Sequence, residues 1–188
     1  MANGSIQLPD FSEPSGAIFS ECDRYRYVLW RRWAIAKPMV LFIALNPSTA
    51  DATVNDPTMR RCISFAQSWG YGGIIGANLF AYRTPQPTVL KQASEPIGPE
   101  GDRWISSLCQ YVVAQPKLAK RKTKGQAIIL AWGNHGQWLG RDRSILQLIQ
   151  AIVPMPHCLT VTKQGQPAHP LYLPKSLKPL PYSTWQSS

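Results

Sequence analysis

Apolar and polar residues alternate along the chain with two different periods. Four mostly continuous apolar runs predict strands that are buried on both faces: residues 39–45, 72–80, 127–132 and 157–162. The segments that separate these runs have apolar residues every three or four positions, which predicts amphipathic helices that start near Asp56, Pro99 and Asn134. Strands that alternate with helices predict a parallel sheet covered by helices on both faces.

This pattern predicts an α/β fold with three layers, α/β/α, around a central, mostly parallel four-stranded sheet. The segment 24–33 is rich in Arg and aromatic residues and predicts one additional, N-terminal edge strand. Residues 1–20 show no such pattern and predict a flexible lead-in. A single α/β domain is expected over residues 21–182, because 188 residues are enough for one compact domain.

The charge of the chain adds an expectation about its partner. It has 20 Lys and Arg residues against 10 Asp and Glu, a formal net charge of +10. Such an excess favours nucleic acid or a nucleotide, with DNA favoured over RNA; a generically basic soluble protein is the alternative. No apolar run is long enough to span a membrane and the N-terminus lacks a signal-peptide pattern, so a cytoplasmic protein without membrane contact is expected. A monomer is the expected oligomeric state, although no pattern in the sequence specifies it.

The four cysteines argue against a metal centre. Cys22, Cys62, Cys109 and Cys158 lie far apart and form no CxxC pair. A zinc site or a disulfide framework is therefore not expected, and an iron–sulfur cluster is the less favoured alternative. Buried, reduced thiols and no cofactor are the prediction.

Polar side chains follow each of the four predicted strands. Ligands of open α/β sheets bind beyond the carboxyl ends of parallel strands, so these groups are expected to share one site. The groups are Asn46, Pro47, Ser48, Thr49 and Asp51 after the first strand, Asn78, Phe80 and Tyr82 after the second, Asn134 and His135 after the third, and Gln166 and His169 after the fourth.

Four segments at these strand ends are similar, in order, to motifs of the uracil-DNA glycosylase superfamily. LNP at 45–47 occupies the place of its catalytic Asp-Pro or Asn-Pro, and GIIGANLFAY at 73–82 is similar to its strand that ends in a base-reading Asn. AIILAWGNHGQWLG at 127–140 resembles its apolar strand with Trp-Gly, and HPLYLP at 169–174 resembles its His-Pro loop. The resemblance spans residues 37–174 and implies a uracil-DNA glycosylase-like fold.

The whole sequence resembles more closely the DUF1643 family of bacterial and phage proteins. The segments that carry this resemblance are LNPSTAD, NDPT and WGNHG. It implies the same fold and the same location of the site, and it implies no particular reaction.

The glycosylase resemblance implies hydrolysis of the N-glycosidic bond of a damaged or modified base in nucleic acid. Asn46 would orient the attacking water, and His169 would donate a hydrogen bond to the departing base. Asp51 is a substitute catalytic carboxylate. Asn78 would read the base edge with its amide. The other implied substrate-binding residues are Pro47, Ser48, Thr49, Phe80, Tyr82, Asn134 and His135.

Further residues are expected to contact a nucleic-acid strand. Leu171 and Tyr172 would fill the stack that a flipped base leaves. Arg60, Arg61, Lys120, Arg121, Lys122 and Lys124 would contact phosphates. The chain departs from the family pattern at Ser48-Thr49, which replaces a Tyr-His pair, and its C-terminal loop lacks the serines that pinch the DNA backbone.

Several of these residues also have a structural interpretation. Asn46-Pro47 is typical of a turn, Asp56 of a helix cap, and Phe80 and Tyr82 of core positions. The basic segment 116–125 is also typical of a solvated loop. Two other functions therefore stay open: a non-catalytic module that binds nucleic acid or a nucleotide, and an enzyme that acts on free nucleotides.

Overall fold

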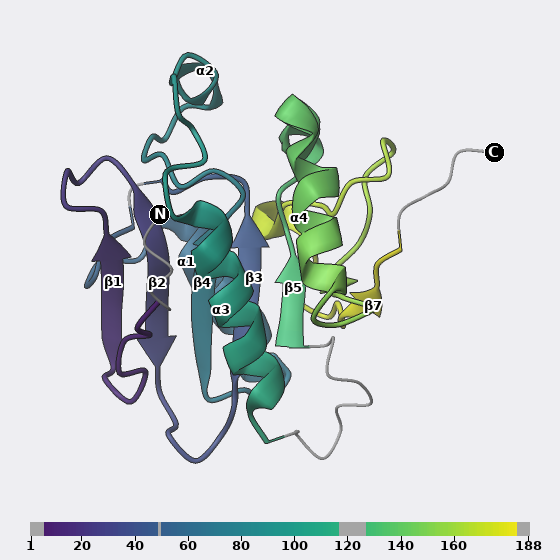
Figure 1. Ribbon diagram of the computed structural model, residues 1–188. Helices are drawn as coiled ribbons and strands as arrows, with labels where there is room; N and C mark the ends of the chain where they lie inside the picture. Colours follow the sequence, from purple (N-terminus) through teal and green to yellow (C-terminus); the bar gives the residue numbers. More distant parts are fainter. Residues whose placement is uncertain (1–5, 49, 117–126, 184–188) are drawn as a thin grey trace.

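The computed structural model describes residues 6–48, 50–116 and 127–183 and contains one mixed sheet of seven strands. The strands lie side by side in the order β1-β2-β4-β3-β5-β6-β7, and Figure 1 labels all of them except β6. They are β1 (Ser15–Phe19), β2 (Arg26–Arg32), β3 (Met39–Ala44), β4 (Gly73–Asn78), β5 (Ile128–Leu130), β6 (His157–Cys158) and β7 (Leu180–Pro181). Neighbours β4, β3, β5 and β6 are parallel, whereas β1, β2 and β7 pair antiparallel.

The α/β class predicted from the sequence is confirmed, but the sheet is larger than the predicted four strands and one edge strand. β2 is not at the edge, because β1 pairs with its outer side. The lead-in predicted for residues 1–20 is also wrong over its described part. Residues 15–19 form β1, and Phe11 is buried against the rings of Trp30 and Tyr111.

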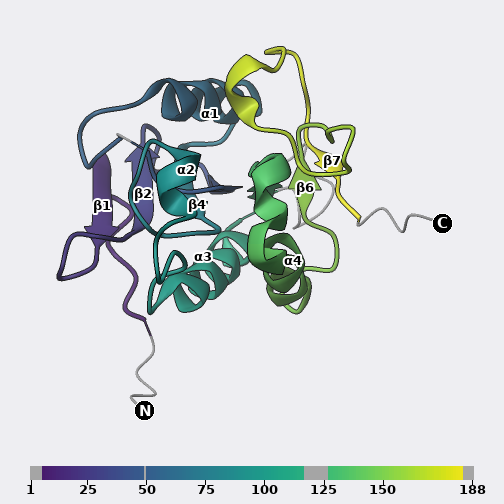
Figure 2. The same cartoon turned by 90° about the horizontal axis from the view of Figure 1, so that it is seen from above.

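Helices cover both faces of the sheet. Figure 2 shows α1 (Pro57–Ser68) on one face and α3 (Gly101–Ala114) and α4 (Arg141–Gln150) on the other. Two separate cores follow from this arrangement. Val40, Phe42 and Phe65 pack between the sheet and α1, whereas residues such as Ile43 and Leu108 pack on the opposite face. None of the helices in the described residues is long and apolar enough to cross a membrane.

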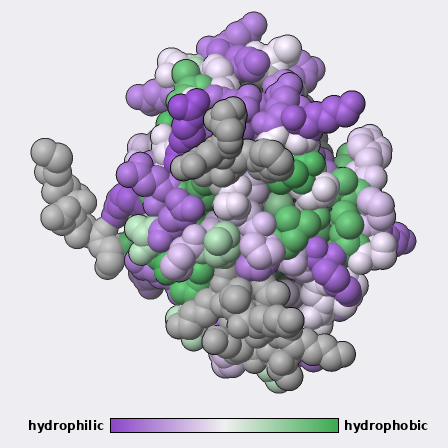
Figure 3. All heavy atoms as spheres, turned by 90° about the vertical axis from the view of Figure 1, so that its right-hand side faces the viewer, coloured by the Kyte–Doolittle hydropathy of each residue, from purple (hydrophilic) through white to green (hydrophobic). Residues whose placement is uncertain are grey.

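Short helices and loops gather where β3, β4 and β5 end. α2 (Pro87–Leu90) and the 3-10 helix η2 (Asn134–Gly140) lie at this end, at the top of Figure 1, and the short 3-10 helix η3 (Pro170–Tyr172) lies beside α1 in Figure 2. The same end is mostly hydrophilic on the face that Figure 3 shows.

Asp56 and Pro57 start α1 as the sequence predicts. The Asp56 carboxylate accepts a hydrogen bond from the Met59 backbone N–H over 2.7 Å, and Pro57 occupies the first turn. This start turns the chain back over the sheet directly after the loop that follows β3. The loop and the first turn of α1 therefore face the same end of the sheet.

Candidate functional site

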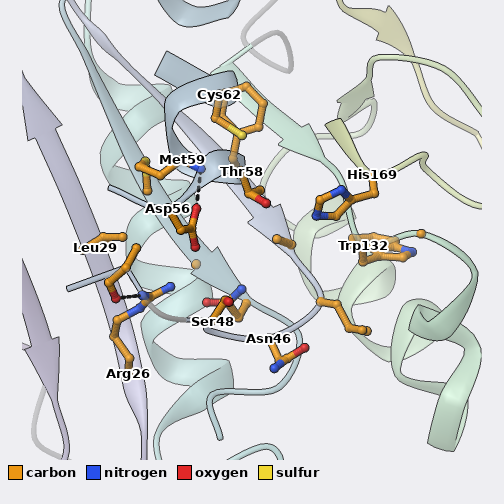
Figure 4. A pocket seen from close by; sticks show the side chains of 18 of the residues that line it. Arg26, Leu29, Asn46, Ser48, Asp56, Thr58, Met59, Cys62, Trp132 and His169 are labelled. Carbon is orange, nitrogen blue, oxygen red and sulfur yellow. Dashed lines mark hydrogen bonds between the residues drawn. The ribbon is translucent and has the colours of Figure 1, made fainter. Parts of the chain in front are cut away.

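A cavity of about 580 Å³ lies at the carboxyl ends of β3, β4 and β5 (Figure 4). Its size is typical of sites for small ligands, which span about 300–1,000 Å³. Its polar lining comes from segments far apart in the sequence. These side chains belong to Arg26, Asn46, Ser48, Asp56, Thr58, Asn78, Thr84, Asn134, His135, Thr162 and His169.

Asn46 lines the cavity, and backbone carbonyls fix its amide. Its Nδ2 donates to the carbonyl oxygens of Pro47, at 3.1 Å, and Thr84, at 2.6 Å. The Thr84 N–H in turn donates to the Pro47 carbonyl. Asn46-Pro47 thus builds a turn, and Asn46 also contributes to the cavity wall. With Nδ2 held, Oδ1 is the amide atom left to accept from a ligand or water.

Asn78, at the end of β4, is the least satisfied amide of the cavity. The residue is only 8% exposed, and its side chain has no hydrogen-bond partner among the described residues. Its amide atoms are not among the fully buried atoms that lack a partner, so they are open to the cavity. The two donors and one acceptor oxygen of Asn78 are therefore available to a polar ligand group in the cavity.

His169 reaches the cavity from the loop before η3. The Leu171 backbone N–H donates to its Nδ1 over 3.3 Å, which assigns the proton of the neutral ring to Nε2. Although part of the residue is exposed to solvent, burial of the ring lowers the pKa of His169, and the charge of Asp56 opposes this shift. His169 is thus a neutral N–H donor at neutral pH.

Asp56 lines the cavity as well as capping α1. The sequence predicted only the cap. Its negative charge acts on Arg26 and on His169, whose pKa values it raises against the effect of burial. Among the described residues that line the cavity, it is the only carboxylate.

Arg26 is a site residue that the sequence analysis missed. It projects from β2 into the cavity, is 6% exposed, and donates from Nη1 to the Ala50 carbonyl. Its Nε is buried without a partner. Burial lowers the pKa of Arg26 to about 10, so it stays cationic at neutral pH. The aromatic and Arg-rich pattern of residues 24–33 gave no sign of which arginine turns inward.

Trp132 forms an apolar wall of the cavity, and a polar network holds it. Its indole Nε1 donates to Gln166 Oε1 over 2.8 Å, and Gln166 Nε2 donates to Asp142 over 2.9 Å. Gly136 lies so close that a Cβ there would be 2.2 Å from the indole ring. The predicted Gln166 therefore acts on the cavity through Trp132.

The predicted residues after β5 also reach the cavity. Asn134 and His135 line it from the start of η2. Asn134 Oδ1 accepts from the Thr162 hydroxyl over 2.6 Å, which ties this turn to the loop after β6. Both residues are exposed, so they lie towards the outside of the cavity.

Four of the predicted catalytic or substrate-binding residues that the structure describes lie outside the cavity lining: Pro47, Asp51, Phe80 and Tyr82. Asp51 accepts from Thr53 and Val54 within its own loop, and these hydrogen bonds lower its pKa. Phe80 is fully buried and packs on Trp138, whereas Tyr82 packs against Tyr25. The structure therefore supports neither a catalytic role for Asp51 nor base stacking by Phe80 or Tyr82.

The predicted strand-contacting residues differ in their surroundings. Tyr172 is 92% exposed at the tip of η3, next to a half-buried Leu171. Arg60 is exposed and donates to the Asn55 carbonyl, whereas Arg61 lies over the ring of Phe65. The remaining predicted residues lie outside the described residues: Thr49, Lys120, Arg121, Lys122 and Lys124.

All four cysteines are free, but only three are buried. Cys62, Cys109 and Cys158 are buried, and Cys62 lines the cavity from α1. Cys22 is exposed, so the prediction of buried thiols is wrong for this residue. Within the described ranges, no group of three or more His, Cys, Asp or Glu side chains is placed to hold a metal ion.

Comparison with known proteins assigns the chain to a family. No curated protein and no solved structure matches it, and none of the comparisons supports the resemblance to uracil-DNA glycosylases. A family model described as "Protein of unknown function (DUF1643)" matches residues 26–171. The match begins at Arg26 and includes Asn46, Asp56, Asn78 and His169. Because it covers well over half of the sequence, the chain belongs to the DUF1643 family.

Proposed function

We propose that this protein takes one nucleotide of a nucleic acid into the cavity and hydrolyses the N-glycosidic bond between its base and its sugar. The observation that carries the proposal is the Asn78 amide, which lines the cavity and has no hydrogen-bond partner among the described residues. It faces a cavity that also contains the neutral imidazole of His169. A base edge offers the donors and acceptors that such an amide binds.

The chemistry requires a donor for the departing base. The bond between the sugar C1′ and the base nitrogen breaks, negative charge grows on the base, and water adds its oxygen to C1′. A neutral imidazole N–H stabilises that charge when it is fixed before the reaction. His169 meets this requirement, because the Leu171 N–H holds its ring with Nε2 protonated.

The attacking water needs an acceptor for its hydrogen bond and, finally, for its proton. Asn46 Oδ1 is suited to orient the water, since Nδ2 is held by two carbonyls. An amide cannot act as a general base, whereas the Asp56 carboxylate in the same cavity can. We therefore assign orientation to Asn46 and proton acceptance to Asp56 rather than to Asp51.

Nucleic acid is the proposed partner, and the uracil-DNA glycosylase-like fold is part of the same proposal. The four ordered motifs support the fold, because their polar residues lie at or after the ends of β3, β4, β5 and β6. The net charge of +10 and the exposed ring of Tyr172 support contact with a strand.

A non-catalytic nucleotide-binding module is the second candidate. The observation that favours it is the amide of Asn46 at a position where the resembled superfamily also has a carboxylate. In addition, Asp56 already uses one interaction to cap α1. Such a module would bind a base through Asn78 without turnover.

Base release from labelled oligonucleotides tests the proposal. The panel contains uracil, mismatched thymine, hypoxanthine, and oxidised and alkylated bases, each in single and double strands. We expect release of one class of base by the wild type and loss of about two orders of magnitude or more in His169→Ala and Asp56→Asn. Asparagine keeps the helix cap, so Asp56→Asn tests chemistry rather than folding.

Lys175→Ala, an exposed change on the loop after η3, is the matched control and should keep wild-type activity. Thermal unfolding of every variant checks that the fold is retained. Undiminished release by His169→Ala and Asp56→Asn would reject the mechanism. No release from any substrate, with saturable binding that Asn78→Ala abolishes, would select the binding module.

A further inference from the structure

Arg26 is a buried cation that no carboxylate contacts directly. It is 6% exposed, and the only hydrogen bond of its side chain among the described residues runs from Nη1 to the Ala50 carbonyl. No ion pair to Arg26 lies within 4.0 Å among the described residues. A guanidinium has five N–H donors, and an incompletely satisfied buried charge is costly. Arg26 therefore has unused binding capacity at the cavity.

The charge around Arg26 favours an anion. Its pKa is lowered first by burial and then by the positive charges of Arg83 and Arg31, while Asp56 and Asp51 act in the opposite direction. Of these four neighbouring charges, that of Asp56 acts most strongly on Arg26. The α1 N-terminus compensates Asp56, through the hydrogen bond from the Met59 N–H. Together with Arg26, these side chains carry three positive and two negative formal charges.

The cavity has two ends of different character. In Figure 4, Arg26 and Asp56 lie on the side opposite His169 and Trp132, with Ser48 between them. The hydroxyls of Ser48 and Thr58 belong to the same lining and can donate to an oxyanion. A nucleotide likewise has its base and its phosphate at opposite ends.

We propose that Arg26 binds a phosphate group of the nucleotide that occupies the cavity, with the Ser48 and Thr58 hydroxyls as additional donors. This inference rests on the proposed nucleotide site and adds the recognition of its phosphate. The phosphate belongs either to a free 5′-mononucleotide or to a nucleotide of a strand. The base then lies towards His169 and Trp132.

Calorimetric measurement of binding separates the contribution of the phosphate to the affinity from that of the base. The probes are inorganic phosphate, the four common deoxynucleosides with deoxyuridine, and their 5′-monophosphates. We expect at least one monophosphate to bind the wild type about ten- to a hundredfold more tightly than its nucleoside. In Arg26→Met the monophosphate should bind no more tightly than its nucleoside, whereas the affinity for the nucleoside should be unchanged.

Two further variants keep the test valid if Arg26→Met does not fold. Arg26→Lys retains the charge but not the planar fork, so it should keep part of the ratio. Asp56→Asn keeps the cap and removes a negative charge, so it should tighten phosphate binding several-fold. Arg143→Gln on α4 removes an exposed positive charge elsewhere and should change nothing.

The outcomes separate this inference from the proposed hydrolysis. The inference is overturned, even if base release is found, when the ratio of nucleotide affinity to nucleoside affinity is the same in the wild type and the Arg26 variants. An Arg26-dependent ratio supports it even if no base is released. Binding of none of the probes overturns it as well. Oligonucleotides with and without a 5′-phosphate, and with an internal target base, then show which source of phosphate is used.

Discussion

At the scale of a single residue, the fold controls the protonation of His169. Burial lowers its pKa from the ordinary 6.5, and Asp56 partly reverses the effect. The folded protein thus binds a proton here less readily than the unfolded chain does. The stability that follows is present above the unfolded pKa and is lost as the pH falls through the folded pKa. His169→Gln should flatten the pH dependence of stability in this window.

An NMR titration measures this pKa directly. The imidazole signal of His169 is the one absent from His169→Gln, and it should titrate below 6.5. Asp56→Asn should lower the pKa further, because a carboxylate that favours the charged imidazole is removed. A pKa that is ordinary, or that rises in Asp56→Asn, would contradict the environment described for the ring.

Cys22 should be the reactive thiol of the folded protein. The Ser20 hydroxyl, followed by Arg24, lowers its pKa to about 7, whereas burial raises the pKa of Cys109 and Cys158 to about 12. We expect one fast-reacting thiol at pH 7.5 in a native alkylation assay, and four after unfolding. Cys22→Ser should abolish the fast phase. A fast phase that persists in this variant would show that a buried thiol is accessible.

At the scale of elements, β2 organises the loop that follows β3. Arg31 donates to Asn55 Oδ1 and to the carbonyls of Asp51 and Val54, so one side chain holds a whole turn. Arg31→Met should lower the free energy of unfolding by about 1–3 kcal/mol, since these hydrogen bonds are lost. It should also speed thermolysin cleavage near the exposed Val54.

Arg32→Met is the matched control for this loop. Arg32 is the next residue of β2, and its Nη2 donates to Ile35 rather than to the loop after β3. Cleavage near Val54 should therefore stay at the wild-type rate. Equal rates of thermolysin cleavage near Val54 in Arg31→Met and Arg32→Met would mean that the turn is stable without Arg31.

Elements with local signals could be predicted from the sequence, and elements set by distant contacts could not. Asp56-Pro57 specifies the start of α1 within four residues, and that prediction is confirmed. Arg26 is positioned by a carbonyl 24 residues away, which no local pattern contains. Phe80 shows a different difficulty: it follows Asn78 closely, yet the chain has left β4 there and turns the ring into the core.

At the scale of the whole molecule, the net charge of +10 predicts salt-dependent binding to polynucleotides. Replacing Lys120, Arg121, Lys122 and Lys124 with alanine should weaken binding to all sequences alike. The slope of log K against log salt should become shallower by up to about 0.9 per lost phosphate contact in a duplex. Fluorescence anisotropy with a labelled duplex at several salt concentrations measures both changes.

Binding of a mononucleotide in the cavity should not depend on these four residues. Their substitution should therefore leave the calorimetric affinity for a 5′-monophosphate unchanged, in contrast to Arg26→Met. An unchanged salt slope in the fourfold variant would mean that other basic residues, such as Arg60, contact the strand.

The pairing of β1 with β2 has a consequence for shortened chains. β2 is antiparallel to β4 on one side and to β1 on the other, so its backbone groups are used on both sides. A protein that began at residue 21 would present a row of free N–H and C=O groups along β2. Such a row is a template for strands of other molecules. β1 therefore prevents other molecules from pairing with β2, which is the strand that supplies Arg26 to the cavity.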